Sequence, residues 1–351
     1  MERSFFRELI HYNQPKDSYI RLIGAGLCMI SVLFTGYFTH QLAIASFGSL
    51  GIFTFLYYQP LPLKQLVLRL SLIGLFLTAG NFFGMLSTHW HWIAPLFVAL
   101  IGLIGRFFFR LYGIAKPGAF FIVMVSAMGA STQIPLHKIP VMSSYFLIGV
   151  CFAVLFGCLL HFFDKRAPQL EAKRSLKERL NDDPAVLIDS LFYSSVLFFA
   201  VYLSMGLQLK NPYWLVVSCA SILQGDNLRA MLHRNIQRIF GTLVGLVIAA
   251  GLLNLPLTVF ETLLVITALF VTVEFFVKRN YAIAQFFTTP MALMLSMLVR
   301  QQYLYSLIQY RFLGIVLGSL LGLAAAWVMT TGLKFYNQKF NLHENFDKET
   351  E

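Results

Sequence analysis

The stretch DKRAPQLEAKRSLKERLNDD, residues 164–183, is the one long polar segment of this 351-residue chain. On both sides of it lie apolar runs, several of them near the roughly 20 residues that a helix needs to cross a bilayer. We read six such runs before the polar segment and six after it. The pattern therefore predicts an all-α, polytopic membrane protein with about 12 transmembrane helices in two halves.

The predicted membrane-spanning helices follow directly from these apolar runs. In the first half they are Ile20–Thr39, Gln41–Tyr58, Leu66–Ser87, Trp92–Phe109, Pro117–Ser131 and Ile139–Phe163. In the second half they are Leu187–Leu207, Pro212–Gln224, Ile236–Leu253, Leu257–Phe276, Tyr281–Val299 and Tyr310–Gly332. We accordingly expect five parts: an N-terminal segment (1–19), a first membrane repeat (20–163), a linker (164–186), a second repeat (187–332) and a C-terminal tail (333–351).

The composition excludes an ordinary soluble domain. Hydrophobic residues make up 58% of the chain and charged residues only 12%, with a mean hydropathy of +0.69, whereas soluble proteins carry about 25% charged residues. Placing the N-terminus in the cytoplasm puts 23 of the 27 basic residues on the inner side and leaves outside only Lys138, Lys210, Arg300 and Arg311. This asymmetry predicts an N-in, C-in topology, with cytoplasmic N-terminal segment, linker and tail. The net charge of +11 is thereby attributed to membrane orientation and not to nucleic acid binding.

Motifs of soluble enzymes and of nucleotide-driven pumps are missing from the sequence. It holds no Gly-x4-Gly-Lys-[Ser/Thr] loop, no Gly-x-Ser-x-Gly elbow and no His-Glu-x-x-His pair. We expect no enzymatic activity, no cofactor and no metal site.

Weak internal similarity suggests that the two halves are repeats. Tyr145-x3-Gly149-x7-Gly157 in the sixth run matches Tyr310-x3-Gly314-x7-Gly322 in the twelfth, and Gly74-x5-Gly80 matches Gly245-x5-Gly251. Because each half has an even number of runs, the two copies must face the same way, related by a pseudo-two-fold axis along the membrane normal. Glycines at four-residue spacing favour close helix contact, either inside the bundle or in a homo-oligomer.

Basic residues cluster at the predicted inner mouth of the second half. Arg234 and Arg238 share one face of a helix entering the membrane, Arg229 precedes them, and Gln224 ends the run before. Guanidinium groups hold carboxylates well, so these residues, with Arg69 in the first half, are candidates for collecting anions. The alternative is that they anchor the chain to lipid phosphate.

The eleventh run is the most polar of the buried segments. Its Tyr281, Gln285 and Thr288 fall at i, i+4 and i+7, and Thr289-Pro290 interrupts the backbone hydrogen bonds. Irregular backbone at membrane depth is tolerated inside protein or along a cavity. The run therefore either lines a substrate site, with Phe286 nearby, or forms a satisfied kink.

Few ionisable groups are available for ion coupling. Glu274 stands four residues before Lys278, which favours an ordinary helical ion pair. Glu261 lies toward the outer side and Asp189 near the inner start of the seventh run. These three are candidates for proton coupling, although none of them stands at a clear midplane position.

Four motifs stand out in the second half: Pro212-Tyr213-Trp214, Gln224-Gly225, Arg238-x-x-Gly241-Thr242-x-x-Gly245, and Tyr281-x-x-Ala284…Thr289-Pro290. In these motifs the chain resembles the fusaric acid resistance (FUSC) family, which includes aromatic acid exporters and is distantly similar to plant aluminium-activated malate transporters. The resemblance implies export of organic, often aromatic, carboxylates across the inner membrane. It also places Tyr213 and Trp214 among the candidate site residues. Gly225 departs from the proline usual there, and the cytosolic domain of larger members is reduced to a linker.

Our functional hypothesis is a secondary transporter that exports aromatic or amphipathic organic anions across the cytoplasmic membrane as a multi-pass protein. Its partners would be the lipid bilayer and a small organic anion, and a homo-oligomer is left open. Two rivals remain: a passive anion channel or uniporter of the malate-transporter type, and a membrane-integral envelope or assembly protein without transport activity.

Overall fold

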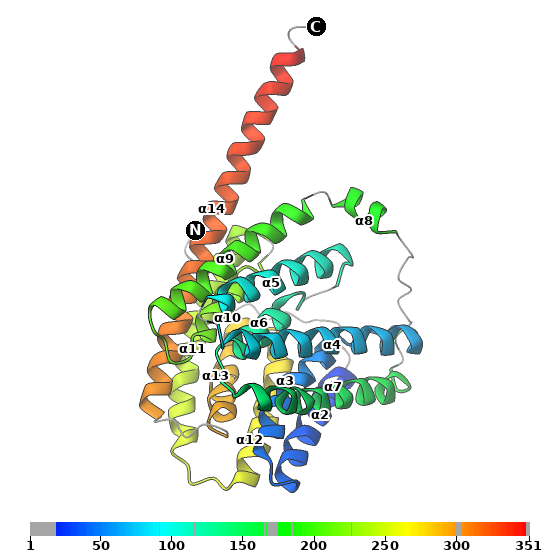
Figure 1. Cartoon of the computed structure of the whole chain (residues 1–351), viewed down its shortest axis with the longest axis vertical. Helices are drawn as coiled ribbons and strands as arrows, with labels where there is room; N and C mark the ends of the chain where they lie inside the picture. Colours follow the sequence, from blue (N-terminus) through cyan, green and yellow to red (C-terminus); the bar gives the residue numbers. More distant parts are fainter. Residues whose placement is uncertain are drawn as a thin grey trace.

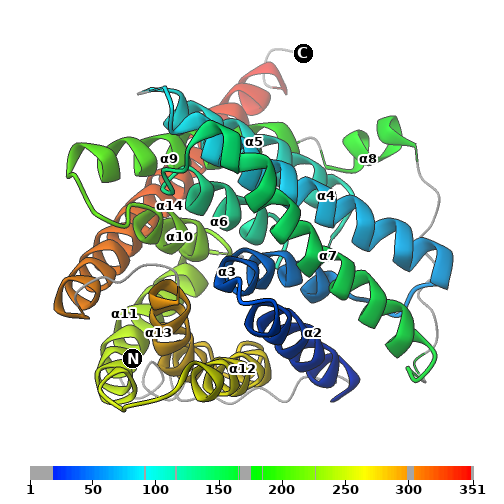
Figure 2. The same cartoon turned by 60° about the horizontal axis from the view of Figure 1, so that its bottom comes forward.

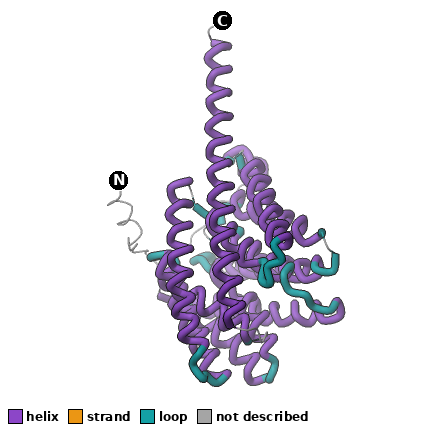
Figure 3. Tube along the Cα trace, turned by 90° about the vertical axis from the view of Figure 1, so that its left-hand side faces the viewer, coloured by secondary structure: helices purple, strands orange, loops and turns teal. Residues whose placement is uncertain are grey.

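The computed structural model describes residues 19–90, 92–114, 117–164, 166, 175–183, 185–225, 227–298 and 304–348. Throughout these ranges every regular element is a helix, and strands are absent (Figure 3). The predicted segment 1–18, much of the predicted linker and the last three residues lie outside the described residues. The prediction of an all-α chain is confirmed.

Each of the twelve predicted runs overlaps a helix. The helix of the ninth run begins before that run, at Leu228, and the last one continues beyond its run to Lys348, through most of the predicted tail. The helices of the first half are α2 (Tyr19–Phe38), α3 (Leu42–Gly51) with the 3-10 helix η1 (Ile52–Tyr57), α4 (Leu63–Ser87), α5 (Ile93–Leu111), α6 (Phe120–Gly129) and α7 (Ile139–His161), which follows the 3-10 turn η2 (Leu136–Lys138). The short α8 (Leu176–Asp182) lies in the linker. Those of the second half are α9 (Val186–Gly206), α10 (Tyr213–Ile222), α11 (Leu228–Leu253), α12 (Val259–Phe276), α13 (Tyr281–Met297) and α14 (Leu304–Lys348).

Among the described residues, eight helices are long and apolar enough to cross a membrane, so the chain is a polytopic membrane protein. The count is lower than the twelve predicted because α3, α6 and α10 have only 10 residues each and α13 has 17. Proline and glycine explain part of this shortening. Pro117 and Gly118 precede α6, with Gly118 in the left-handed region at φ +53. Pro212 caps α10. Pro290 does not shorten α13, because the helix continues past it to Met297.

Glycines bring pairs of helices into close contact. On α11, Gly245 lies so near α13 that an added Cβ would be 2.7 Å from Cβ of Thr289. Gly314, Gly318 and Gly322 of α14 face α10 in the same way, along Trp214 to Ile222. Small residues allow this approach where lipid supplies no hydrophobic drive for helix association. The glycine spacing seen in the sequence therefore serves contacts inside the chain.

The helices run in two main directions. In Figure 1, α4 and α7 lie side by side across the view, whereas α11, α13 and α14 run along the long axis. The C-terminal part of α14 extends beyond all the other helices (Figures 1 and 3). Figure 2 shows the short helices α3, α6 and α10 near the centre of the molecule, where α6 contacts α10. These three short helices thus lie where the two halves meet.

Two further pairs of helices join the halves at their edges. The helix α2 packs against α12, and α5 packs against α9. We refer to these two contacts as the α2–α12 seam and the α5–α9 seam.

Candidate ligand-binding cavity

A cavity of about 550 Å³ lies between the two halves. The first half contributes α2, α3, η1 and α6 to its walls, and the second half contributes α10 to α14. Nine residues that the sequence pointed to line this one cavity: Tyr213, Trp214, Gln224, Arg234, Arg238, Glu274, Tyr281, Gln285 and Thr288.

Arg238 is held inside the cavity by neutral partners. Its Nε donates to the Ser218 hydroxyl at 2.9 Å, and its Nη1 donates to the hydroxyls of Ser221 at 3.2 Å and Tyr281 at 2.7 Å. Only 4% of the residue is exposed. Its place follows from the start of α11 at Leu228, which is fixed by the N-cap Asn227, whose side chain accepts a hydrogen bond from the Ala230 amide. The charge of Arg238 is therefore oriented but not neutralised by these contacts.

Arg234, one turn earlier on α11, lies over the ring of Tyr281. Its guanidinium carbon is 4.5 Å from the ring centroid, which is a cation–π contact. Tyr281 thus receives one arginine on its face and a second at its hydroxyl.

Arg311 is a cavity residue that the sequence analysis missed. It lies on α14 with its guanidinium carbon 5.2 Å from the centroid of the Trp214 ring, and only 5% of it is exposed. The topology prediction counted it only as one of four basic residues on the outer side, at the start of the twelfth run (Tyr310–Gly332). A signal was nevertheless present, because Arg311, Gly314 and Gly318 share the helix face that packs on α10.

The lining of the cavity is strongly basic. No carboxylate of the described residues forms an ion pair with Arg234, Arg238 or Arg311. Lys278 and Arg21 also line the cavity, and Arg21 forms an ion pair with Glu274 at 3.4 Å. The described lining therefore holds five basic side chains and the single carboxylate of Glu274. Such a balance favours an anionic ligand.

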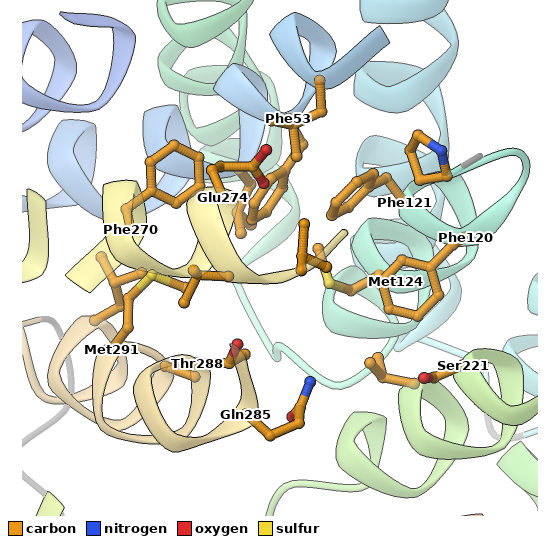
Figure 4. A pocket seen from close by; sticks show the side chains of 18 of the residues that line it. Phe53, Phe120, Phe121, Met124, Ser221, Phe270, Glu274, Gln285, Thr288 and Met291 are labelled. Atoms are coloured by element: carbon orange, nitrogen blue, oxygen red, sulfur yellow. The ribbon is translucent and has the colours of Figure 1, made fainter. Parts of the chain in front are cut away.

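Aromatic side chains form the opposite wall. Phe53 stacks on Phe121 with ring centroids 4.7 Å apart and lies 6.3 Å from the Phe270 ring. Figure 4 shows these rings facing Gln285 and Thr288, which point into the cavity from α13. The cavity thus offers rings on one side and hydrogen-bonding groups on the other.

Five of the candidate binding residues lie elsewhere. Arg229 is exposed at the start of α11, and Arg69 is half-buried on α4. Phe286 packs edge-on against Phe240, with centroids 6.1 Å apart. Thr289 is buried against Gly245, and Pro290 is buried within α13. Thr289 therefore faces α11 and not the cavity, whereas Gln285 both lines the cavity and packs against Gly241 of α11.

Two of the three candidate coupling residues have structural partners away from the cavity. Glu261 forms a capping box with Thr258 at the start of α12, accepting from the Thr258 amide at 2.8 Å. Asp189 accepts from Arg106 at 2.7 Å and also pairs with Arg110 at 2.9 Å. Of the three, Glu274 alone lines the cavity.

These features define a class: a polytopic α-helical membrane protein with a basic, aromatic-walled cavity between its halves. Residues 196–325 match the model of a family described as fusaric acid resistance protein-like. The family resemblance deduced from the motifs between Pro212 and Pro290 is therefore confirmed, and the chain carries a fusaric acid resistance protein-like region in its second half.

One curated relative extends this comparison. The chain is 34% identical over 111 residues to the "Uncharacterized membrane protein YvaC" of Bacillus subtilis (strain 168). The aligned part is 32% of this chain and 18% of that relative, so the chain spans less than a fifth of the relative's length. No solved structure matches the chain.

Proposed function

We propose that this protein is a secondary transporter that exports organic carboxylate anions, aromatic or amphipathic, across the cytoplasmic membrane. The observation that carries the proposal is the composition of the cavity. Three buried or half-buried arginines, which pair with no carboxylate of the described residues, face a wall of phenylalanine rings. The proposal assigns no catalytic reaction to the chain.

The cavity suits a small amphipathic anion in size and in chemistry. Its volume of about 550 Å³ falls within the 300–1,000 Å³ usual for small-molecule sites. A carboxylate placed between Arg238 and Arg234 would receive charge-assisted hydrogen bonds. An aromatic ring attached to it would reach Phe53 and Phe121 and gain the free energy of burying apolar surface.

The directions of packed helices support twelve alternating segments in two parallel repeats. Gly314 lies against Trp214 and Gly322 against Cys219, so α14 and α10 run in the same direction. Contacts of Gly241 with Ala282 and of Gly245 with Thr289 give α11 and α13 a common direction as well. Helices two or four segments apart are expected to be parallel in an alternating topology. We therefore keep the N-in, C-in arrangement as part of the proposal.

Equivalent contacts recur in the first half. There α3 packs on α7 and α4 on α6 through glycines, as α10 packs on α14 and α11 on α13. Gly80 faces α6 as Gly245 faces α13, whereas Gly74 faces Val150 of α7. The contacts thus favour matching Gly80 with Gly245, in place of the match of Gly74 with Gly245 suggested by spacing.

A cavity between two repeats supports alternating access, in which one half rocks against the other. The driving force need not come from protons. An anion leaving the cell gains about 2.3 kcal/mol per 100 mV of inside-negative potential. Export driven by the potential alone fits a cavity whose described lining holds a single carboxylate.

The test is uptake of aromatic and aliphatic carboxylates into inverted membrane vesicles. Wild type is compared with Arg238→Ala, which removes a cavity charge, and with Arg229→Ala, which removes a charge of the same helix outside the cavity. We expect saturable uptake that Arg238→Ala lowers at least tenfold and Arg229→Ala leaves nearly unchanged. Equal uptake by all three proteins would disprove the role of the cavity. Voltage-driven current without saturation would support the channel, and no uptake of any compound would support the assembly protein.

A further inference from the structure

The two seams carry ion pairs at equivalent positions with opposite polarity. In the α2–α12 seam the cation is Arg21 and the anion is Glu274. In the α5–α9 seam the cation is Arg106 and the anion is Asp189. Asp189 lies 168 positions after Arg21, and Glu274 lies 168 positions after Arg106. Arg21 and Arg106 of the first half are therefore basic where their counterparts in the second half, Asp189 and Glu274, are acidic.

The same offset of 168 positions relates the residues at the other ends of the two seams. The two halves are therefore aligned in the same register at both ends of each seam. Phe34 contacts Phe260 with ring centroids 5.1 Å apart, and Tyr202 contacts Trp92 at 5.8 Å. Tyr202 again lies 168 positions after Phe34, and Phe260 lies 168 after Trp92. Aromatic residues pair with one another whichever half supplies them, so this end of the seam does not discriminate between partners.

The charged ends of the seams do distinguish the complementary half from a second copy of the same half. If two copies of the first half packed as the two halves do, Arg21 of one copy would meet Arg106 and Arg110 of the other. If two copies of the second half did so, Asp189 would meet Glu274, with Lys278 at the position equivalent to Arg110 giving partial relief. Like charges placed together at a partly buried contact exclude the wrong partner.

We propose that these seams make each half selective for the complementary half and exclude a second copy of itself. The inference rests on seam contacts and not on the transport proposal. It has a consequence for assembly, because the first half is synthesised before the second and neighbouring chains are exposed to domain swapping in that interval. The arginines of the first half would prevent its premature pairing with the first half of another chain.

The test reverses one seam and leaves both intramolecular ion pairs possible. In the full chain, Arg21→Glu/Glu274→Arg puts a carboxylate on α2 where a second first half would present Arg106, so that first halves become self-complementary. The matched control, Arg21→Lys/Glu274→Asp, changes the same two positions and keeps their charges. Each protein is expressed as two copies in the same cells, one copy with one tag on its first half and the other copy with a second tag there. Both copies carry a protease site inserted at Ala172 in the linker. The linker is then cut and one tag is captured.

We expect the second tag to be captured with the first at background level for wild type and for the charge-conserving control. The reversed variant is expected to raise this capture at least fivefold. A second readout works in membranes without purification and starts from a chain whose four native cysteines are replaced by alanine. In that background, Phe34→Cys with Trp92→Cys forms a disulfide between chains only where first halves have paired. Equal capture by wild type and the reversed variant, with equal cross-linking, would overturn the inference, as would strong first-half capture by wild type.

Discussion

Tyr281 joins the two arginines of α11 into one unit. Its hydroxyl accepts a hydrogen bond from Arg238 at 2.7 Å and lies 2.6 Å from the Ser221 hydroxyl, while its ring supports Arg234 at 4.5 Å. A tyrosine at the first position of α13, after the cap formed by Asn280, thus sets the position of both charges on the neighbouring helix.

The first prediction removes only the hydroxyl of this tyrosine. Tyr281→Phe retains the ring under Arg234 but deletes a partner of Arg238, and hydrogen bonds to charged groups contribute about 1.5–3 kcal/mol. We expect the KM for the transported anion to rise about tenfold with a smaller change in maximal rate, measured as uptake into vesicles. Tyr202→Phe is the matched control because Tyr202 lies outside the cavity, stacked on Trp92. An unchanged KM for Tyr281→Phe would show that this hydroxyl does not orient Arg238.

The second prediction concerns the arginine that the sequence analysis missed. Arg311→Gln removes a buried charge that no carboxylate of the described residues pairs with, and we expect it to weaken anion binding about tenfold. Arg311→Lys keeps the charge but loses the planar contact with Trp214, so its effect should be smaller. The measurement is the Kd of the purified protein for an aromatic carboxylate. If Gln and Lys weaken binding equally, Arg311 acts through packing and not through charge.

A third prediction separates potential-driven flux from proton coupling. Glu274→Gln removes the single carboxylate of the described cavity lining and takes away the ion-pair partner of Arg21. Because the cavity then becomes more basic, we expect the KM for the anion to fall severalfold while the flux keeps its dependence on voltage. Glu261→Gln serves as a control, since Glu261 caps α12 outside the cavity. Loss of a pH-gradient dependence in Glu274→Gln alone would instead assign proton coupling to Glu274.

Part of the site could be predicted because helical spacing decides which residues share a face. Tyr281, Gln285 and Thr288 follow the i, i+4, i+7 rule and all three line the cavity, as do Arg234 and Arg238 at i and i+4. Thr289 is adjacent in sequence but faces α11. The residue types indicated which side chains could bind an anion, and the helical spacing indicated which of them face the same side of the helix.

The rest depends on contacts between distant segments, which one sequence does not encode locally. Phe53 and Phe121 meet only because η1 and α6 come together at the centre of the molecule. Arg69 resembles Arg234 in being a basic residue early in the third helix of its half, yet only Arg234 lines the cavity. Helix length was overestimated at α6 and α10 because apolar composition continues into the turns that end these helices. At α3 the predicted run is helical almost throughout, but its second part is the 3-10 helix η1.

The last prediction tests the close packing that holds α11 against α13. At Gly245 an added Cβ would lie 2.7 Å from the Thr289 Cβ and 2.8 Å from the Gln285 carbonyl oxygen, so Gly245→Ala must push the two helices apart. Overpacking of this kind costs about 1–3 kcal/mol, and it would also displace Gln285 from the cavity wall. At Gly251, on the same helix, no atom lies within 4 Å of the added Cβ, and alanine favours the helical backbone over glycine. We therefore expect Gly245→Ala to lower the thermal unfolding midpoint by several degrees and to reduce uptake, whereas Gly251→Ala should match or exceed wild type in both. Equal stability of the two variants would mean that α11 and α13 are not in the contact described.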